Sequence, residues 1–186
     1  MTYRNAFRRR PSLPPRGVVR AACQVGASLL EVLAYTGVAA IVIAGAVGVL
    51  GSALSSSDSH KTIVEVNSLR IGVKSLLSSH ANFGTAALND LLIASRVLPS
   101  TLLVNAASGS ISNLWGGAVI VQGYTNSFTI SYDGIPRQSC SRIASTGING
   151  SFGVSVNGVA QTIPVKPAAA DSACGQPSNT IVWAIK

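Results

Sequence analysis

Hydrophobic side chains are concentrated in one stretch near the start of the chain, from Gly26 to Leu54. No charged residue occurs between Val32 and Leu54, so a helix over these positions would be roughly 34 Å long and could cross the core of a bilayer. The exception is Glu31, at the edge of the stretch. A carboxylate in that place is costly unless it has a partner, so Glu31 is a candidate functional residue.

A different pattern begins after the serine-rich run at 55–59. Lys61 and Glu65, one turn apart, are expected on one face of an amphipathic helix. Apolar residues at three- and four-residue steps predict its other face: Ile63, Val66, Leu69, Val73, Leu76 and Leu77. The two patterns together predict a single helix over 27–80, with 27–54 spanning the membrane and 55–80 docking on a globular domain.

Small residues form a ridge inside the apolar stretch. They recur at four-residue spacing, with two glycines beside them: Ala40, Ala44, Gly48 and Ser52, then Gly37 and Gly45. Such a ridge allows helices to pack closely in lipid or in a bundle. A simple membrane anchor tolerates the same residues, so the ridge alone does not decide between the two.

The segment 81–186 has the pattern of a small globular domain. A short helix is predicted from Thr85 to about Ser95, with Leu88, Leu91 and Leu92 on its inner face. Asn157-Gly158 lies between two β-like runs and is a strong signal for a type I′ hairpin. The predicted strands are 117–121, 127–132, 152–156, 159–165 and 180–185. The predicted class is α+β, with the long N-terminal helix packed on an antiparallel β-sheet.

Charge is distributed unevenly along the chain. The formal net charge is +8, but six arginines precede Gly26 in a segment without acids. Residues 1–26 are therefore interpreted as a basic cytoplasmic leader, which would orient the following span with its N-terminus inside. Basic and acidic residues nearly balance in the remainder, so no direct binding to nucleic acid is expected.

The leader does not have the form of an ordinary secretory signal. Such a signal has a shorter apolar region that is followed by a small-residue cleavage site, and no such site ends this one. Ala21-Ala22-Cys23 is similar to a lipoprotein site, but it precedes the apolar stretch instead of following it. A cut before the stretch would retain the helix. It would also leave two of the three cysteines, the even number that an oxidising compartment favours.

Candidate catalytic and metal-binding groups are scattered. His60 and His80 are expected to be solvated. The acids of the segment 55–186 are scattered along the chain: Asp58, Glu65, Asp90, Asp133 and Asp171. The glycines at 147, 150 and 153 do not have the spacing of a phosphate loop. We therefore expect no enzyme activity, cofactor or metal.

The motif from Gly26 to Val32, GASLLEV, resembles the type III prepilin signal of type IV pilins, in which glycine precedes a small or apolar residue and glutamate is fifth in the mature chain. This resemblance implies that a prepilin peptidase cleaves after Gly26 and N-methylates Ala27. The long leader and the non-Phe first mature residue are similar to the type IVb branch.

Motifs in the distal domain extend the resemblance over most of 26–186. They are similar to major pilins of the PilS type, including those of plasmid-borne conjugative thin pili: Leu98-Pro99-Ser100, the run Asn113 to Val119, Phe128-Thr129-Ile130 and the run Asn179 to Trp183. The resemblance implies the lollipop pilin fold and a disulfide between Cys140 and Cys174. That bridge would close a loop of about 35 residues and stabilise the fold by roughly 3 to 4 kcal/mol.

The expected function is that of a structural subunit. By the resemblance, the prepilin sits in the inner membrane with its head in the periplasm, and inner-membrane assembly machinery then polymerises it into a homo-oligomeric extracellular pilus, for conjugation or adhesion. Glu31 would pair with the Ala27 amine of a neighbouring subunit and set the axial register, or else would only mark the interfacial end of an anchor. Open alternatives are a minor pilin, a type II secretion pseudopilin, and a single-pass membrane-anchored receptor or enzyme domain.

Overall fold

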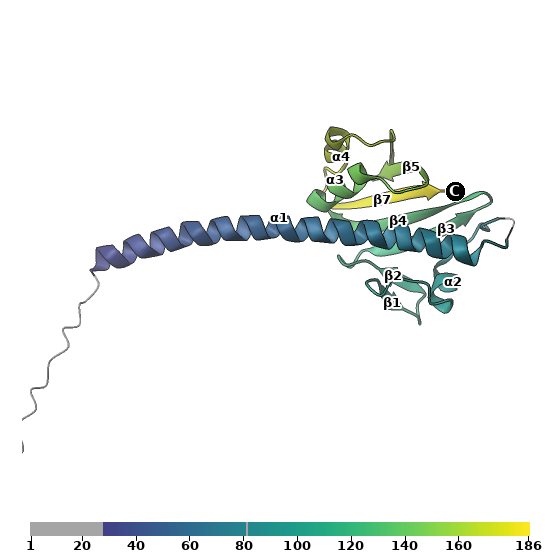
Figure 1. Ribbon diagram of the computed structural model, residues 1–186, viewed down its shortest axis with the longest axis horizontal. Coiled ribbons are helices and arrows are strands. Elements are labelled where there is room, and N and C mark those ends of the chain that lie inside the picture. Colours follow the sequence, from purple (N-terminus) through teal and green to yellow (C-terminus); the bar gives the residue numbers. More distant parts are fainter. Residues whose placement is uncertain (1–27, 81) are drawn as a thin grey trace, which may run out of the picture. The chain divides into compact units, whose positions relative to one another are not determined.

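The computed structural model describes residues 28–80 and 82–186 (Figure 1). The chain divides into two units, one that ends at Ile43 and one that runs from Ala44 to Lys186. A single helix, α1 (Leu29–Leu76), belongs to both. The prediction of one long helix is confirmed, although α1 ends a few residues before the expected limit at 80.

Ten further elements follow α1 in residues 82–186. In chain order they are α2 (Asn89–Ala94), β1 (Leu103–Asn105), β2 (Ser110–Ser112), β3 (Ala118–Tyr124), β4 (Ser127–Pro136), α3 (Arg137–Thr146), β5 (Ser151–Val156), β6 (Val159–Gln161), α4 (Pro167–Ala173) and β7 (Ser178–Ile185).

The seven strands form one sheet in the order β1-β2-β3-β4-β7-β5-β6, and every neighbouring pair is antiparallel. The last strand, β7, lies between β4 and β5, so the C-terminal segment completes the centre of the sheet (Figure 1). The pairing of β4 with β7 runs from Phe128 opposite Ile185 to Pro136 opposite Ser178. The predicted α+β class, with an antiparallel sheet, is confirmed.

The core lies between the sheet and the second half of α1, which crosses one face of it (Figure 1). Val66, Leu69 and Val73 of α1 are fully buried, as the amphipathic pattern predicts, and Ile63, Leu76 and Leu77 pack at the edge of the same core. Alternate residues of the central strands face them, because side chains of a strand alternate between its two faces. These strand residues are Val119, Val121, Phe128, Ile130, Tyr132, Ile181, Trp183 and Ile185.

The prediction that Lys61 and Glu65 share a face apart from the apolar one is wrong. Glu65 is only 3% exposed and lies in the same stripe as Val66 and Leu69. Lys61 remains exposed and pairs with Asp58 one turn earlier, at 3.4 Å. The buried stripe of α1 is therefore wider than its apolar residues, and it includes an acid.

The short helix is smaller than predicted because residues 86–88 pair with β3 instead of forming its first turn. The backbone N–H of Leu88 donates to the Val121 carbonyl, and the N–H of Gly123 donates to the Ala86 carbonyl. This pairing, along the part of β3 that β2 does not cover, leaves only Asn89–Ala94 for α2. Leu88 and Leu92 face the core as predicted, but Leu91 is 42% exposed.

Strand limits also differ from the predictions. β3, β4 and β7 are longer than the predicted runs, and β6 ends at Gln161 instead of 165, before Pro164, which has no N–H to donate to a ladder. β1 and β2 have only three residues each and had no predicted counterpart. The hairpin signal is correct: Asn157 and Gly158 both have positive φ, at 51° and 80°.

Candidate functional site

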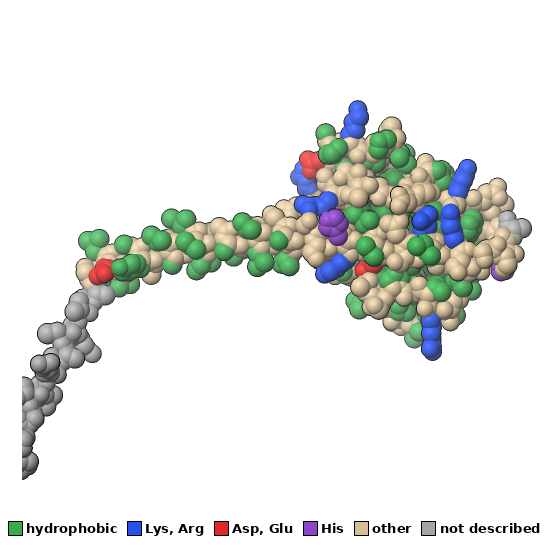
Figure 2. All heavy atoms as spheres, in the orientation of Figure 1, with side chains coloured by type: hydrophobic (Ala, Val, Ile, Leu, Met, Phe, Trp, Pro, Cys, Tyr) green, Lys and Arg blue, Asp and Glu red, His purple; other side chains and the backbone are tan. Residues whose placement is uncertain are grey.

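The first part of α1 presents an unusual surface. Its helix starts at the Ser28 carbonyl, which accepts hydrogen bonds from the N–H groups of Glu31 (2.8 Å) and Val32 (3.1 Å). Every residue from 28 to 54 is exposed, including large aliphatic side chains such as Leu29 (81%) and Ile41 (74%). Figure 2 shows these hydrophobic side chains in green along the helix. Apolar area of this extent marks a surface for lipid or for other proteins.

Length and composition agree with that interpretation. Within the described residues, α1 is the helix long and apolar enough to cross a membrane, and none of the residues in its most apolar window is buried. The glycines of this region do not lie against another described part of the chain. A Cβ at Gly37, Gly45, Gly48 or Gly51 would meet no other atom of the described residues within 4 Å, apart from the neighbouring backbone of α1 itself.

Glu31 lies in the first turn of α1, where the positive end of the helix dipole favours a negative charge. The Tyr35 hydroxyl, one turn along, donates a hydrogen bond to Glu31 Oε1 at 3.4 Å. The next polar side chain, Thr36, is used differently: its hydroxyl donates to the Val32 carbonyl at 2.9 Å. Among the described side chains, Tyr35 is therefore the hydrogen-bond donor to the Glu31 carboxylate.

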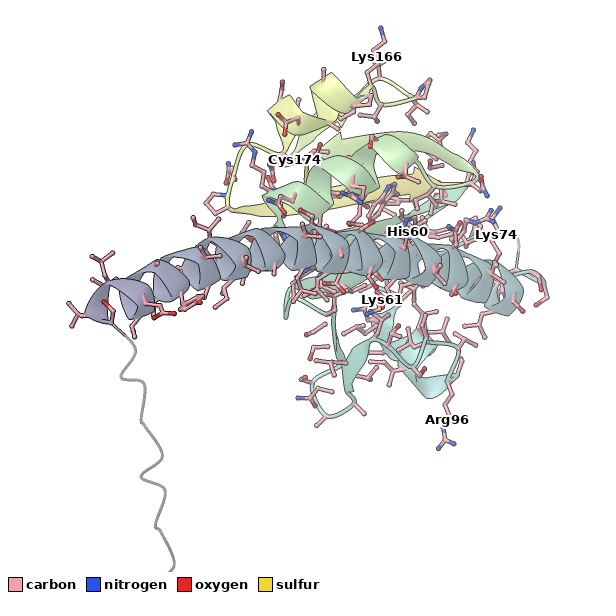
Figure 3. The ribbon with its side chains drawn as sticks, turned by 60° about the vertical axis from the view of Figure 1, so that its left-hand side comes forward. His60, Lys61, Lys74, Arg96, Lys166 and Cys174 are labelled. Carbon is pink, nitrogen blue, oxygen red and sulfur yellow. A yellow bond between two sulfur atoms is a disulfide. The ribbon has the colours of Figure 1, made fainter. Side chains whose placement is uncertain are left out.

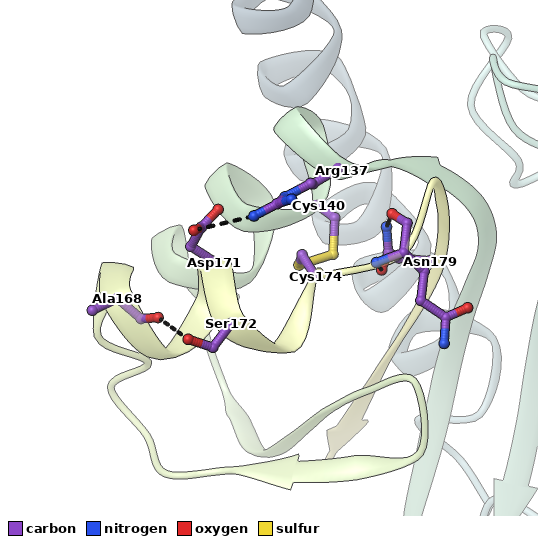
Figure 4. Close-up of polar contacts among 8 residues, drawn as sticks. Arg137, Cys140, Ala168, Asp171, Ser172, Cys174 and Asn179 are labelled. Carbon is purple, nitrogen blue, oxygen red and sulfur yellow. Dashed lines mark hydrogen bonds and ion pairs between the residues drawn. A yellow bond between two sulfur atoms is a disulfide. The ribbon is translucent and has the colours of Figure 1, made fainter.

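The disulfide lies in the head, between Cys140 of α3 and Cys174 at the C-terminal end of α4 (Figure 4). Their Cα atoms are 5.9 Å apart, and both residues are fully buried. Arg137 and Asp171 form an exposed ion pair between the same two helices, at 3.5 Å. The bridge thus fastens α4, which precedes β7, to α3, which follows β4.

The buried acid Glu65 lies next to a hollow of about 580 Å³ between α1 and the loop at 99–101. Its lining includes His60 and Lys61, both labelled in Figure 3, and Thr101. Both carboxylate oxygens of Glu65 are buried without a hydrogen bond of good geometry to any described residue. Burial raises the pKa of Glu65, and the hydroxyls of Thr101 and Tyr132 and the charge of Lys61 oppose this increase.

Tyr132 of β4 shares this environment. Burial, followed by the nearby Glu65 carboxylate, raises the pKa of the Tyr132 phenol. The phenolic oxygen has no hydrogen-bond partner among the described residues. Glu65 and Tyr132 thus place two neighbouring polar groups inside the apolar interface between α1 and the sheet.

Other titratable groups do not converge. Residues 28–80 and 82–186 contain no group of three or more histidine, cysteine, aspartate or glutamate side chains that could hold a metal ion. His60 and His80 are exposed. Lys74, Arg96 and Lys166 extend outward at separate places on the head (Figure 3).

The predicted site residues fall into three groups. Gly26 and Ala27 lie outside the described residues, so cleavage and methylation remain predictions. Glu31 lies exposed in the first turn of α1, and its proposed pairing is a prediction too. Cys140 and Cys174 are bonded to each other, as the resemblance implies.

Sequence reasoning missed Tyr35 and the burial of Glu65. The four-residue spacing from Glu31 to Tyr35 is a recognisable signal for a side-chain contact on a helix. Glu65 lies four residues before Leu69 and next to Val66, so helical geometry alone places it close to the buried stripe.

Comparisons with known proteins identify relatives. Residues 56–186 match the family model described as PilS N terminal. A type IVb pilin from Salmonella typhi is similar in structure, with a TM-score of 0.55 and 23% identity over 65% of this chain and 95% of that one. TcpA, a type IV pilin from Vibrio cholerae El Tor biotype, has a TM-score of 0.52 and 11% identity over 70% of this chain and 99% of that one. A comparison with curated protein sequences gave no match.

Proposed function

The chain belongs to the PilS family and is a pilin subunit with the type IV pilin fold, and we propose that it is made as a prepilin, processed in the membrane and polymerised into a surface filament. Pilins are structural subunits and not enzymes. The observation that carries the proposal is the exposed apolar helix, 29–54, which continues directly into a helix packed on a pilin head. Such a surface must be shielded from water, first by lipid and then by other copies of the chain.

In the membrane stage, residues 27–54 form the span. The basic leader, residues 1–26, stays in the cytoplasm, and the head enters the periplasm. The disulfide between Cys140 and Cys174 supports this location, since disulfides form and persist in oxidising compartments.

In the processing stage, prepilin peptidase cleaves after Gly26 and methylates the new amine of Ala27. The support is the motif GASLLEV, together with the family to which the rest of the chain belongs. Cleavage at this point removes the leader but leaves the apolar helix intact.

In the assembly stage, inner-membrane assembly machinery extracts the subunit and packs its helix among those of its neighbours. Glu31 would then pair with the Ala27 amine of an adjacent copy. Both groups lie where water is scarce, so a charge pair is strongly favoured over two separate charges. The pairing requires a fixed axial offset between subunits, and this offset defines the register of the filament.

Mass spectrometry and N-terminal sequencing of sheared surface filaments test this proposal. We expect a chain that begins at Ala27, carries an N-methyl group and contains an intact Cys140–Cys174 bridge. A chain that begins at Met1 would contradict processing and favour a membrane-anchored receptor or enzyme domain. Filaments in which the chain is only a trace component would instead indicate a minor pilin or a pseudopilin.

Replacement of Glu31 by valine or alanine tests the register. The leader should still be removed, and the protein should reach the membrane in normal amount, because the cleavage site and the apolar span are unchanged. Filaments should be lost. A normal filament yield from either variant would overturn the pairing of Glu31 with Ala27. The use of the filament, conjugation or adhesion, is tested by mating and cell-attachment assays of the same variants.

A further inference from the structure

The hydrogen bond between Tyr35 and Glu31 joins two polar side chains of the exposed apolar helix. Tyr35 and Glu31 are separated by one helical turn, which places their side chains on the same face. Tyr35 is 68% exposed, so it does not contribute to the core of the head. Its hydroxyl is also not used by the backbone, unlike that of Thr36, which donates to Val32 and Leu33 carbonyls.

From this contact we propose that Tyr35 is a positioning residue for Glu31, holding one carboxylate oxygen so that the other is presented to the amine of a neighbouring subunit. The inference rests on the proposed function and deepens it, because it identifies what prepares Glu31 for pairing. A carboxylate has two oxygens and about four acceptor sites, so a hydrogen bond to Oε1 leaves Oε2 free for a second donor.

The physical need is greatest before assembly. A carboxylate that enters the lipid without a partner is penalised, and the penalty falls when a donor from the same helix accompanies it. A phenol suits this position because its ring remains in the apolar or interfacial layer while its hydroxyl meets the charge.

The contact also has a consequence for assembly. A free glutamate side chain samples several rotamers, and pairing with an incoming amine must then immobilise it. A side chain already held by Tyr35 loses less freedom when the amine arrives. Tyr35 therefore lowers the cost of adding a subunit without contacting the neighbour's amine itself.

The test combines filament yield with a spectroscopic reading of the hydroxyl. Tyr35→Phe removes only the donor, and we expect it to lower the yield of filaments about tenfold, with normal leader removal and membrane level. Thr36→Val is the matched control. It removes a hydroxyl from the adjacent residue that is bonded to the backbone, and its filament yield should remain close to that of the unaltered chain.

The second measurement uses the full chain in detergent micelles, with carbon-13 at the tyrosine ring carbon that bears the hydroxyl. The Tyr35 signal is identified by its absence from the Tyr35→Phe spectrum. In the Glu31→Val variant this signal should move upfield, because the hydroxyl loses a charged acceptor, whereas Thr36→Val should leave it in place. An unshifted Tyr35 signal in Glu31→Val would overturn the inference, as would a normal filament yield from Tyr35→Phe.

These outcomes separate the inference from the proposed function. Normal filaments from Glu31→Val would contradict the pairing role of Glu31. If filaments are lost in Glu31→Val but are normal in Tyr35→Phe, Glu31 keeps its role and the positioning by Tyr35 alone is rejected.

Discussion

The side chains of Asn157 and Asn179 are hydrogen-bonded to each other, with Nδ2 of Asn157 donating to Oδ1 of Asn179 at 2.9 Å. Asn157 also donates to the Ala173 carbonyl and accepts from the Thr180 N–H. Asn179 donates to the Ile135 carbonyl at 3.2 Å. This pair therefore connects the β5–β6 hairpin, the end of α4, β4 and β7. Asn179 is shown with the disulfide in Figure 4.

Loss of the Asn179 amide should destabilise the head markedly. Asn179 is 1% exposed, so Asn179→Ala leaves buried partners without hydrogen bonds, and we expect the free energy of unfolding to fall by about 2 to 3 kcal/mol. The measurement is thermal unfolding of the full chain in mild detergent, followed by circular dichroism. Asn105→Ala is the control. Asn105 also accepts a backbone N–H, from Ala107, but it is exposed, so its loss should change stability by less than about 0.5 kcal/mol.

Removal of the disulfide should have a slightly larger effect. The bridge joins cysteines 34 residues apart, and a closed loop of that length contributes roughly 3 to 4 kcal/mol in the chain-entropy model. The double variant Cys140→Ser, Cys174→Ser should therefore unfold at a clearly lower temperature under oxidising conditions. Reducing agent should lower the unfolding temperature of the unaltered chain but not that of the double variant. An equal response of both proteins to the reductant would be inconsistent with this role of the bridge.

Two valines just over half a turn apart on α1 provide a matched test of helix docking. Val66 is fully buried against the sheet, whereas Val64 is 64% exposed. Val66→Ala removes two buried methyl groups and leaves a cavity, so it should cost about 2 kcal/mol of unfolding free energy. Val64→Ala makes the same chemical change in solvent and should cost less than about 0.5 kcal/mol. Equal losses of unfolding free energy in the two variants would contradict the assignment of Val66 to the buried face of α1 and of Val64 to the exposed face.

Glu65 should make stability depend on pH. Its pKa is raised in the folded chain by burial, so the folded state holds the proton more tightly than the unfolded state does. Its contribution is complete below the ordinary value of 4.5, and it is lost as pH rises from there through the raised pKa. Unfolding temperatures of the unaltered chain should thus decline over this range relative to those of Glu65→Gln, which cannot ionise.

Asp58→Asn is the comparison for that experiment. Asp58 forms an exposed pair with Lys61, so its replacement should leave the decline caused by Glu65 in place. If Glu65→Gln follows the same pH dependence as the unaltered chain, another group must be responsible.

Much of the fold and of the candidate site was readable from local patterns. The apolar run and the three- and four-residue steps at Val66, Leu69 and Val73 predicted a long helix with an exposed half and a buried stripe, because helical periodicity is a local property. The Asn157-Gly158 hairpin was equally local, since both positions need positive φ. The motif around Glu31 and the pairing of Cys140 with Cys174 came from resemblance to a family and not from periodicity.

Tertiary structure decided the features that depend on distant partners. β1 and β2 are too short to carry a pattern of their own and exist because β3 gives them an edge to pair with. β7 takes the centre of the sheet although it is last in the chain, which no local signal encodes. Glu65 is buried because the sheet and the loop at 99–101 close over it, and Tyr132, 67 positions away, then becomes its neighbour. The sequence by itself thus determined which segments are helix and strand and which residue types are available, whereas only the folded chain decided which polar groups share a low-dielectric environment.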